Sequence, residues 1–359
     1  TDIKSGIPEG LSAKVSKVDI GVRSGKKNSL ELTSQIAPNP ISSGIAFLSG
    51  SQSANGSWSQ NGKADFIETA AVMRALQYLN QRVGTGTIEQ AKIDTMLAAA
   101  KIFLERSFPE NNDYLAEKAT FLTRAGEDMT SLAEYLFAQM SDMDLGFGVR
   151  RNYASDIVTT AKALEALTAT GFADAGPDPD YTKKALLLYL LSRQSHDDGG
   201  WPELTGETSS VFATNMVLRA LLPYRAVTIV GAPAGDIVIA SHLNNGINYL
   251  NTYRYSWGSW KDDVLLTGFS FDTLLNYGNK PFVLGFLERA LNWLRNSQNA
   301  DGSFGNSPDA MITAYALLGL GEPDMTILDI QNLYSAASST AGVRITLKNI
   351  GYITSLPIY

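Results

Sequence analysis

Two carboxylates, Asp65 and Glu68, lie three residues apart in a stretch whose apolar residues recur with a helical period. Residues at i and i+3 share one face of a helix, so both side chains would point to the same side. A carboxylic acid beside a carboxylate can donate and accept a proton, which is general acid–base chemistry. If the chain is an enzyme, we expect Asp65 and Glu68 to be its catalytic residues.

A second group of carboxylates lies in Gly-rich turns and comprises Asp142, Asp144, Asp197, Asp198 and Glu203. Oxygen ligands on a turn suit Ca²⁺, and paired carboxylates can act as acid and base on a glycoside. The simpler interpretation is a solvated acidic turn. The chain has no Cys and two His, which argues against zinc and thiolate sites. We therefore expect no cofactor, with Ca²⁺ at an acidic turn as the alternative, and no other metal.

The segments that position these residues repeat along the chain. The stretch from Gln52 to Trp58 matches the stretch from Gln298 to Phe304 in spacing, and looser copies end at Phe147, Trp201 and Trp260. After each turn an acid precedes a Thr by four residues, in the pairs Asp65/Thr69, Asp156/Thr160, Asp263/Thr267 and Asp309/Thr313, with Ser210/Thr214 in the fourth copy. A feature found in nearly every repeat usually holds the repeat together. We expect the acids to cap helices and the turn aromatics to pack between outer helices.

Each repeat has two helical patterns joined by a turn, which predicts six helical hairpins, at 41–80, 91–125, 129–170, 180–224, 237–277 and 282–320. A hairpin can bury its apolar face only against its neighbours, so six of them favour a closed ring. The expected fold is mainly α, an (α/α)6 toroid with short β-segments at both termini. We expect an N-terminal β-segment or extended arm at 1–40, the toroid at 41–322 and a C-terminal β-segment at 323–359.

Composition limits the partners. The chain has 359 residues, is 44% hydrophobic and carries a net charge of −7, which argues against nucleic acid and anionic membranes. No apolar run approaches a transmembrane length. The lack of Cys and the many Ser, Thr, Asn and Gly residues are compatible with a bacterial secreted or cell-surface protein whose signal peptide has been removed.

The repeated Gln, Gly and aromatic residues, followed by Asp-x-x-x-Thr-Ala, resemble the α/α toroid superfamily. This superfamily includes squalene and terpene cyclases, prenyltransferase β-subunits, cobalamin carriers and thioester domains. The resemblance covers about residues 41–322 and implies a toroid fold. It does not fix a function, because the superfamily includes both enzymes and carriers. The end of the chain also resembles the opening strands of immunoglobulin-like CARDB modules.

The superfamily places its chemistry at the start of the second helix of a hairpin. Class II cyclases have Asp-x-Asp-Asp-Thr-Ala there, and the segment from Asp65 to Ala70 resembles it with Ile67 in place of the proton-donating Asp. The positions that match the prenyltransferase zinc ligands are Asp263, Leu265 and Ile312, of which only the first can bind zinc. The thioester Cys is absent.

Apolar and aromatic residues on the expected inner helices form a second set of candidates. They would bind an apolar or flat ligand, or simply fill the core. These ligand-binding candidates are Met73, Phe212, Met216, Phe269, Phe271, Met311 and Tyr315.

Three functions fit these patterns. The leading interpretation is a non-catalytic, exported toroid that binds an apolar small molecule or assembles with a protein or with itself through its terminal strands. The first alternative is an isoprenoid-handling, terpene cyclase-like enzyme with a degenerate acid motif. The second is a polysaccharide lyase or hydrolase. Its candidate residues are Asp197, Asp198, Glu203, Asp262 and Asp263.

Overall fold

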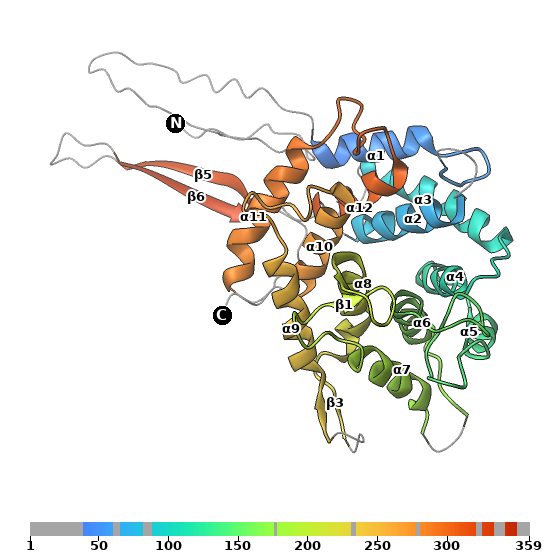
Figure 1. The fold of residues 1–359 in the computed structure, drawn as a ribbon. Coiled ribbons are helices and arrows are strands. Elements are labelled where there is room, and N and C mark those ends of the chain that lie inside the picture. The colour runs from blue at the N-terminus through green and yellow to red at the C-terminus, as the bar shows by residue number, and fades with distance from the viewer. Residues whose placement is uncertain are drawn as a thin grey trace, which may run out of the picture.

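The computed structural model describes residues 39–59, 65–81, 88–175, 178–230, 235–277, 281–320, 325–333 and 342–349. Its helices pair into six hairpins that follow one another around a ring (Figure 1). The outer helices are α1 (Pro40–Ser51), α3 (Ile88–Arg106), α5 (Thr130–Phe137), α7 (Tyr181–Leu191), α9 (Ile239–Thr252) and α11 (Pro281–Asn296). The inner helices are α2 (Asp65–Asn80), α4 (Asn112–Arg124), α6 (Ile157–Ala169), α8 (Val211–Leu221), α10 (Val264–Asn276) and α12 (Ala310–Leu320).

The inner helices contact one another in the order α2, α4, α6, α8, α10 and α12, and α12 contacts α2 again. The ring is therefore closed by a contact between the last hairpin and the first (Figure 1). This arrangement confirms the predicted mainly-α toroid of six hairpins. It buries the faces of each hairpin that a single hairpin would leave in water.

The repeated Thr and the turn aromatic form one structural unit. In each of five hairpins the backbone N–H of the aromatic residue donates to the Thr hydroxyl, at 2.9 to 3.0 Å. The five aromatic side chains are fully buried, and the indole N–H of Trp58, Trp201 and Trp260 donates to a carbonyl of its own outer helix at 2.8 Å. The aromatics thus fix each turn between the two helices of its hairpin.

The acids ahead of the inner helices act as caps where the preceding turn is described. Asp156, Asp263 and Asp309 accept from the backbone N–H three residues later, at 2.7 to 2.8 Å. Ser210 replaces the acid at α8 and caps that helix in the same way. These bonds satisfy N–H groups that have no partner inside the helix.

The repeated Gln joins one hairpin to the next. The amide of Gln52, Gln194 and Gln298 donates to a carbonyl in its own turn and to a carbonyl at the start or middle of the next outer helix. The last of these bonds runs from Gln298 to the Pro40 carbonyl at 2.8 Å, across 258 positions of the chain. It therefore links the final turn to α1 at the point where the ring closes.

Gly302 lies where the last turn packs against α1 and the ring closes, and its replacement would test this packing. Its φ is +89°, and a Cβ added there would lie 2.3 Å from the Ser43 carbonyl oxygen of α1. We expect Gly302→Ala to lower the free energy of unfolding by about 2 kcal/mol or more, since backbone strain and a backbone clash add. Gly126→Ala is the matched control, because Gly126 has the same φ with no atom within 4 Å of the added Cβ. If urea denaturation gave equal losses of unfolding free energy for Gly302→Ala and Gly126→Ala, the contact with α1 would be unimportant.

Three short antiparallel hairpins accompany the helices. They pair β1 (Trp201–Pro202) with β2 (Ser209–Ser210), β3 (Thr228–Ile229) with β4 (Ile237–Val238), and β5 (Met325–Leu333) with β6 (Gly342–Asn349). The predicted N-terminal β-segment falls almost entirely outside the described residues. The CARDB-like character of the C-terminal segment and the boundaries of the three regions stay predictions. Among the helices that the structure describes, none combines the length and apolarity needed to cross a bilayer.

Candidate functional site

Charged side chains occupy the inner helices at one repeated position. Counting five residues beyond the repeated Thr gives Arg74 on α2, Glu165 on α6, Arg219 on α8 and Asp272 on α10. Arg74, Glu165 and Asp272 are buried, and Arg219 is largely buried. Because charged groups are expensive to bury without a partner, a layer of them at the centre of a ring calls for a specific explanation.

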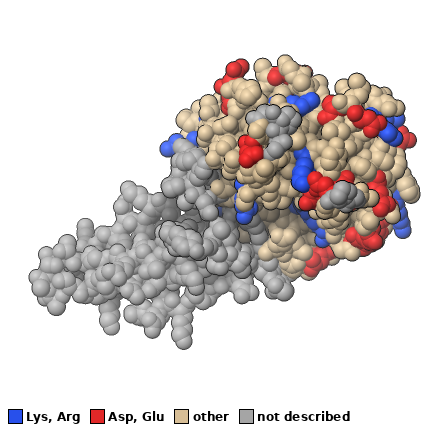
Figure 2. All heavy atoms as spheres, turned by 90° about the horizontal axis from the view of Figure 1, so that it is seen from below, with Lys and Arg blue, Asp and Glu red and all other residues tan. Residues whose placement is uncertain are grey.

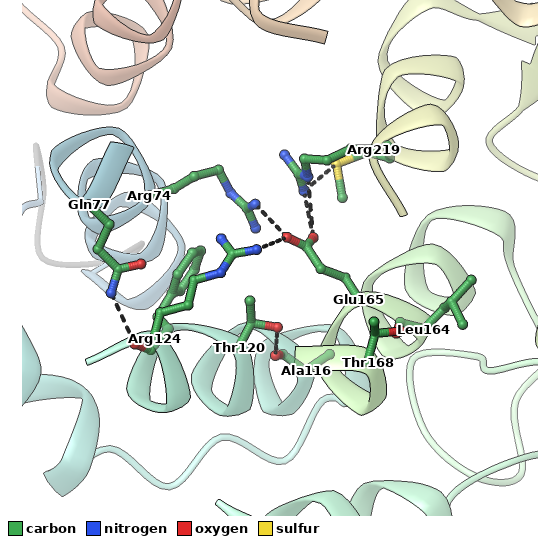
Figure 3. Close-up of polar contacts among 11 residues, drawn as sticks. Arg74, Gln77, Ala116, Thr120, Arg124, Leu164, Glu165, Thr168 and Arg219 are labelled. Atoms are coloured by element: carbon green, nitrogen blue, oxygen red, sulfur yellow. Dashed lines mark hydrogen bonds and ion pairs between the residues drawn. The ribbon is translucent and has the colours of Figure 1, made fainter. Parts of the chain in front are cut away.

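Three of these side chains, joined by one from α4, form what we call the arginine cluster: Arg74, Arg124, Arg219 and Glu165. The four side chains come from four consecutive inner helices and point toward one another (Figure 3). Glu165 Oε1 accepts from Arg74 and Arg124, both at 2.9 Å, and Oε2 accepts from Arg219 at 3.1 and 3.2 Å. A single carboxylate thus holds three guanidinium groups.

The pKa values reflect this crowding. Burial alone would raise the pKa of Glu165, but the charges of Arg219, Arg74 and Arg124 outweigh it and hold that pKa well below its usual range. Burial lowers the pKa of Arg219, and repulsion from Arg74 lowers it further. Burial also lowers the pKa of Arg124. Glu165 is therefore ionised at any ordinary pH, and the arginines are crowded by like charge.

A second charged group, the acid cluster, consists of Asp113 and Glu117 on α4 and Lys162 on α6. Lys162 Nζ lies 2.9 Å from Glu117 Oε1 and 3.5 Å from Asp113 Oδ2. Burial raises the pKa of Asp113, and the Glu117 carboxylate raises it further, against the opposing effect of Lys162. Burial lowers the pKa of Lys162, but Glu117 and Asp113 outweigh it and raise that pKa. Asp113 is thus a carboxyl group biased toward its protonated form.

Aromatic rings from three inner helices form a row that contacts the arginine cluster. Phe269 packs on Phe212 at a centroid distance of 5.9 Å and on Tyr315 at 5.2 Å. The Arg219 guanidinium lies 5.0 Å from the centroid of Phe269. The row Phe212, Phe269 and Tyr315 therefore joins α8, α10 and α12 next to the arginine cluster.

The structure separates the apolar residues singled out from the sequence. Phe212, Phe269 and Tyr315 come together in this row, and Met216 Sδ lies 3.4 Å from Arg219 Nη2. Met311 keeps partial exposure near the start of α12. Met73 and Phe271 are almost completely buried in the two hydrophobic cores. Phe269 and Met216 are as fully buried as Met73 and Phe271, so only Phe212, Met311 and Tyr315 keep the partial exposure that contact with a ligand requires.

Asp65 and Glu68 both lie in the first turn of α2, where sequence spacing puts them. Asp65 is partly exposed, and Glu68 is 8% exposed. Next to them Phe66 of α2 stacks on Tyr114 of α4 at 4.9 Å. This stacked pair joins the first turn of α2 to the first turn of α4.

Most of the acidic-turn residues serve their own turns. Asp144 and Asp198 each accept from a backbone N–H two residues on and from a Ser hydroxyl across the turn. Glu203 accepts from the Ser210 hydroxyl at 2.8 Å, and Asp142 makes a loose, exposed pair with Arg151 at 3.5 Å. In the part of the chain that the structure describes, no three His, Cys, Asp or Glu side chains converge as a metal site would require.

One face of the molecule can be compared with these internal charges. On the face drawn in Figure 2, acidic and basic side chains are both present among neutral ones over the described part of the ring.

Both clusters escaped the sequence analysis, which followed the repeated markers. The arginine cluster has a signal in the sequence, because the position five residues after the Thr should be apolar in a core and is charged in four hairpins. The acid cluster has a weaker one. Its hairpin keeps the acid Asp113 but lacks the turn motif, so neither Asp113 nor Glu117 was given a chemical role.

Known proteins share this ring. No protein-family model matches the chain. The squalene–hopene cyclase of Zymomonas mobilis is 26% identical over 203 residues, which cover 48% of this chain and 31% of that enzyme. The chain thus spans about a third of the length of this curated relative.

Solved structures extend the similarity. The type II terpene cyclase MstE from Scytonema, as a variant in complex with its product merosterolic acid A, aligns with a TM-score of 0.59 at 15% identity, covering 79% of this chain and 95% of that one. An ent-copalyl diphosphate synthase from Streptomyces platensis aligns with a TM-score of 0.53 at 18% identity, covering 71% of this chain and 50% of that one. An inactive variant of an α-1,6-mannanase of Salegentibacter aligns with a TM-score of 0.57 at 9% identity, covering 78% of this chain and 97% of that one. The chain has the α/α toroid fold.

These comparisons correct the leading functional interpretation. A non-catalytic binding or assembly toroid is contradicted, because the curated relative and several of the structural neighbours are cyclases, one of them solved with substrate and with product. The error had a physical cause. Loss of the Asp-x-Asp-Asp motif on α2 was equated with loss of proton chemistry, although carboxyl groups on other inner helices, such as Asp113 on α4, could also donate a proton.

Proposed function

We propose that this chain is an isoprenoid-handling enzyme of the terpene cyclase type, which closes a ring by protonating an alkene. One observation carries the proposal: a carboxyl group with a raised pKa, Asp113, and a row of three aromatic rings both lie on inner helices of a toroid similar to those of terpene cyclases. The terpene cyclase-like alternative from the sequence analysis thus becomes the main proposal. The proposed proton donor is Asp113 on α4 instead of Asp65 or Glu68 on α2.

The acid cluster suits proton donation to carbon. Burial and the Glu117 carboxylate raise the pKa of Asp113, and Lys162 at 3.5 Å stabilises the carboxylate that forms when the proton leaves. In the reaction the Asp113 O–H bond breaks, the alkene π electrons form a new C–H bond, and the adjacent carbon becomes a cation. A second alkene closes the ring, and loss of a proton to solvent makes the overall change an isomerisation.

The aromatic row suits the cations that follow. An aromatic face attracts a positive charge, and the attraction grows when water is excluded. Phe212 and Tyr315 are both partly exposed and both contact the buried ring of Phe269. These two side chains can therefore contact a ligand while Phe269 holds them in place. Carbocations formed near them would be stabilised without a nucleophile that ends the reaction early.

The glycan interpretation is less well supported, although a mannanase shares the ring. Asp198 and Glu203 are engaged in hydrogen bonds within their own turn, and Asp263 caps α10. Carboxylates committed to backbone N–H and Ser hydroxyl groups are poorly placed to act on a sugar.

The test is incubation of the purified chain with geraniol, farnesol, geranylgeraniol and their diphosphates, followed by gas chromatography with mass spectrometry. We expect a cyclic isomer of at least one substrate, absent from protein that has been heat-denatured. Release of reducing sugar from α-mannan, together with unchanged isoprenoids, would favour the glycan interpretation instead.

A further inference from the structure

The arginine cluster holds more positive charge than its own carboxylate can balance. Three arginines converge on Glu165, while Asp272 acts on Arg124 and Glu117 acts on Arg74. The three guanidinium groups thus share the one carboxylate that contacts them directly. Like charges held this close repel one another, and an anion bound among them would lower that cost.

The arginine cluster also has hydrogen-bond donors that Glu165 does not satisfy. Each guanidinium has five N–H donors, and Glu165 accepts from only one or two nitrogens of each arginine. Among the described residues, the buried Arg219 Nη1 has no hydrogen-bond partner. Such a donor is expected to be satisfied by a group that binds there, since buried polar atoms rarely stay unpaired.

Solvent and ligands have a route to this layer. The Arg124 side chain is 43% exposed and that of Arg219 is 14% exposed, while the Glu165 carboxylate behind them is 10% exposed. The arginines therefore present donors outward from the carboxylate that anchors them (Figure 3). Guanidinium groups bind carboxylate and phosphate oxygens in pairs, which makes an anion the matching ligand.

Two residues of the clusters, Asp113 and Arg124, lie at opposite ends of α4. Asp113 is in its first turn and Arg124 is its last residue. Eleven residues of one helix separate their Cα atoms by about 16 Å. At covalent bond lengths near 1.5 Å this is on the order of three isoprene units. An extended prenyl chain could thus reach the acid with its terminal alkene while its head group reaches the arginines.

We infer that the arginine cluster binds the anionic head group, a carboxylate or a diphosphate, of a short prenyl substrate whose alkene end reaches Asp113. This inference rests on the proposed function for the identity of the apolar part. It adds the head-group chemistry and the orientation of the ligand in the ring. Arg219 and Arg124 are the residues that contact the anion, and Glu165 positions them.

Isothermal titration calorimetry on the full chain tests the inference without turnover, using Asp113→Asn protein throughout. The probes are farnesyl diphosphate, farnesoic acid, neutral farnesol and inorganic pyrophosphate. We expect the two anionic prenyl compounds to bind at least tenfold more tightly than farnesol. Arg219→Met and Arg124→Gln should each weaken anion binding by about 10- to 100-fold, as for loss of a charged hydrogen bond, and leave farnesol unchanged.

The control is Arg150→Gln, because Arg150 pairs with Glu110 at an exposed site away from the ring centre. Arg124→Gln also guards against misfolding, since this side chain is the most exposed of the three. Equal affinity for farnesol and the anions, insensitive to both variants, would overturn the anion site and leave the proposed function standing. Binding of pyrophosphate alone, lost in Arg219→Met, would retain the anion site and count against an isoprenoid substrate. A preference for the diphosphate or the carboxylate identifies the head group.

Discussion

Replacing Glu165 with Gln is expected to lower the free energy of unfolding by about 3 to 5 kcal/mol at neutral pH, the cost of leaving buried charges without their partner. Glu165 is the common acceptor for Arg74, Arg124 and Arg219, and it ties four inner helices together. Its neutral replacement leaves three like charges in contact. Guanidinium chloride denaturation followed by circular dichroism measures the change.

The pH dependence of this loss follows from the sign of the shift. The pKa of folded Glu165 lies below the usual 4.5, so its contribution to stability is complete above that value and declines as pH falls through the folded pKa. The difference in the free energy of unfolding between wild type and Glu165→Gln should therefore become smaller at acidic pH. Glu105→Gln, at an exposed pair with Lys101, should change little at any pH. A stable Glu165→Gln protein at pH 7 would refute the charge-balancing role of Glu165.

Replacing Asp113 with Asn is expected to lower the cyclisation rate by about 100- to 10,000-fold, the range typical for loss of a general acid. Asn matches the carboxyl group in shape and cannot supply the proton. The fold should persist, because Glu117 still pairs with Lys162 at 2.9 Å. Product formation per unit time, measured by gas chromatography, gives the ratio to wild type.

Two further variants locate the acid. Asp142→Asn should retain full activity, because its side chain is 88% exposed on an outer turn. Glu68→Gln tests the acid expected from the sequence, in the first turn of α2. Activity should also fall as pH rises through the folded pKa of Asp113, which burial raises above its usual value. Loss in Glu68→Gln with full activity in Asp113→Asn would place the acid on α2.

The toroid could be predicted from the sequence because its repeats are local. A Gln, a Gly, an aromatic residue and a Thr at fixed spacing describe one hairpin completely, and the structure assigns a hydrogen bond to the Gln, the aromatic residue and the Thr. Ring closure follows from the repeat number, since the bond from Gln298 to Pro40 repeats the bond from Gln194 to His242. Local chemistry repeated in five of the six hairpins leaves little choice of fold.

The site was harder to predict because it is not repeated. The partners of Glu165 lie 91, 41 and 54 positions away in the chain, and only the closed ring brings them together. Motif reasoning favoured the first turn of each inner helix, where caps are found. It therefore selected Asp65 and Glu68 and missed Asp113 and Glu117, whose hairpin has lost the turn motif.

Cyclisation in deuterium oxide tests the central claim most directly, because the proton that starts the reaction would come from an exchangeable carboxyl group. We predict that the cyclic product carries one deuterium atom on the carbon that received the proton, with no diphosphate released. The Asp113→Asn variant should form almost no cyclic product and therefore almost no labelled product. A cyclic product without deuterium, formed with release of diphosphate, would contradict protonation as the first step and exclude Asp113 as its acid.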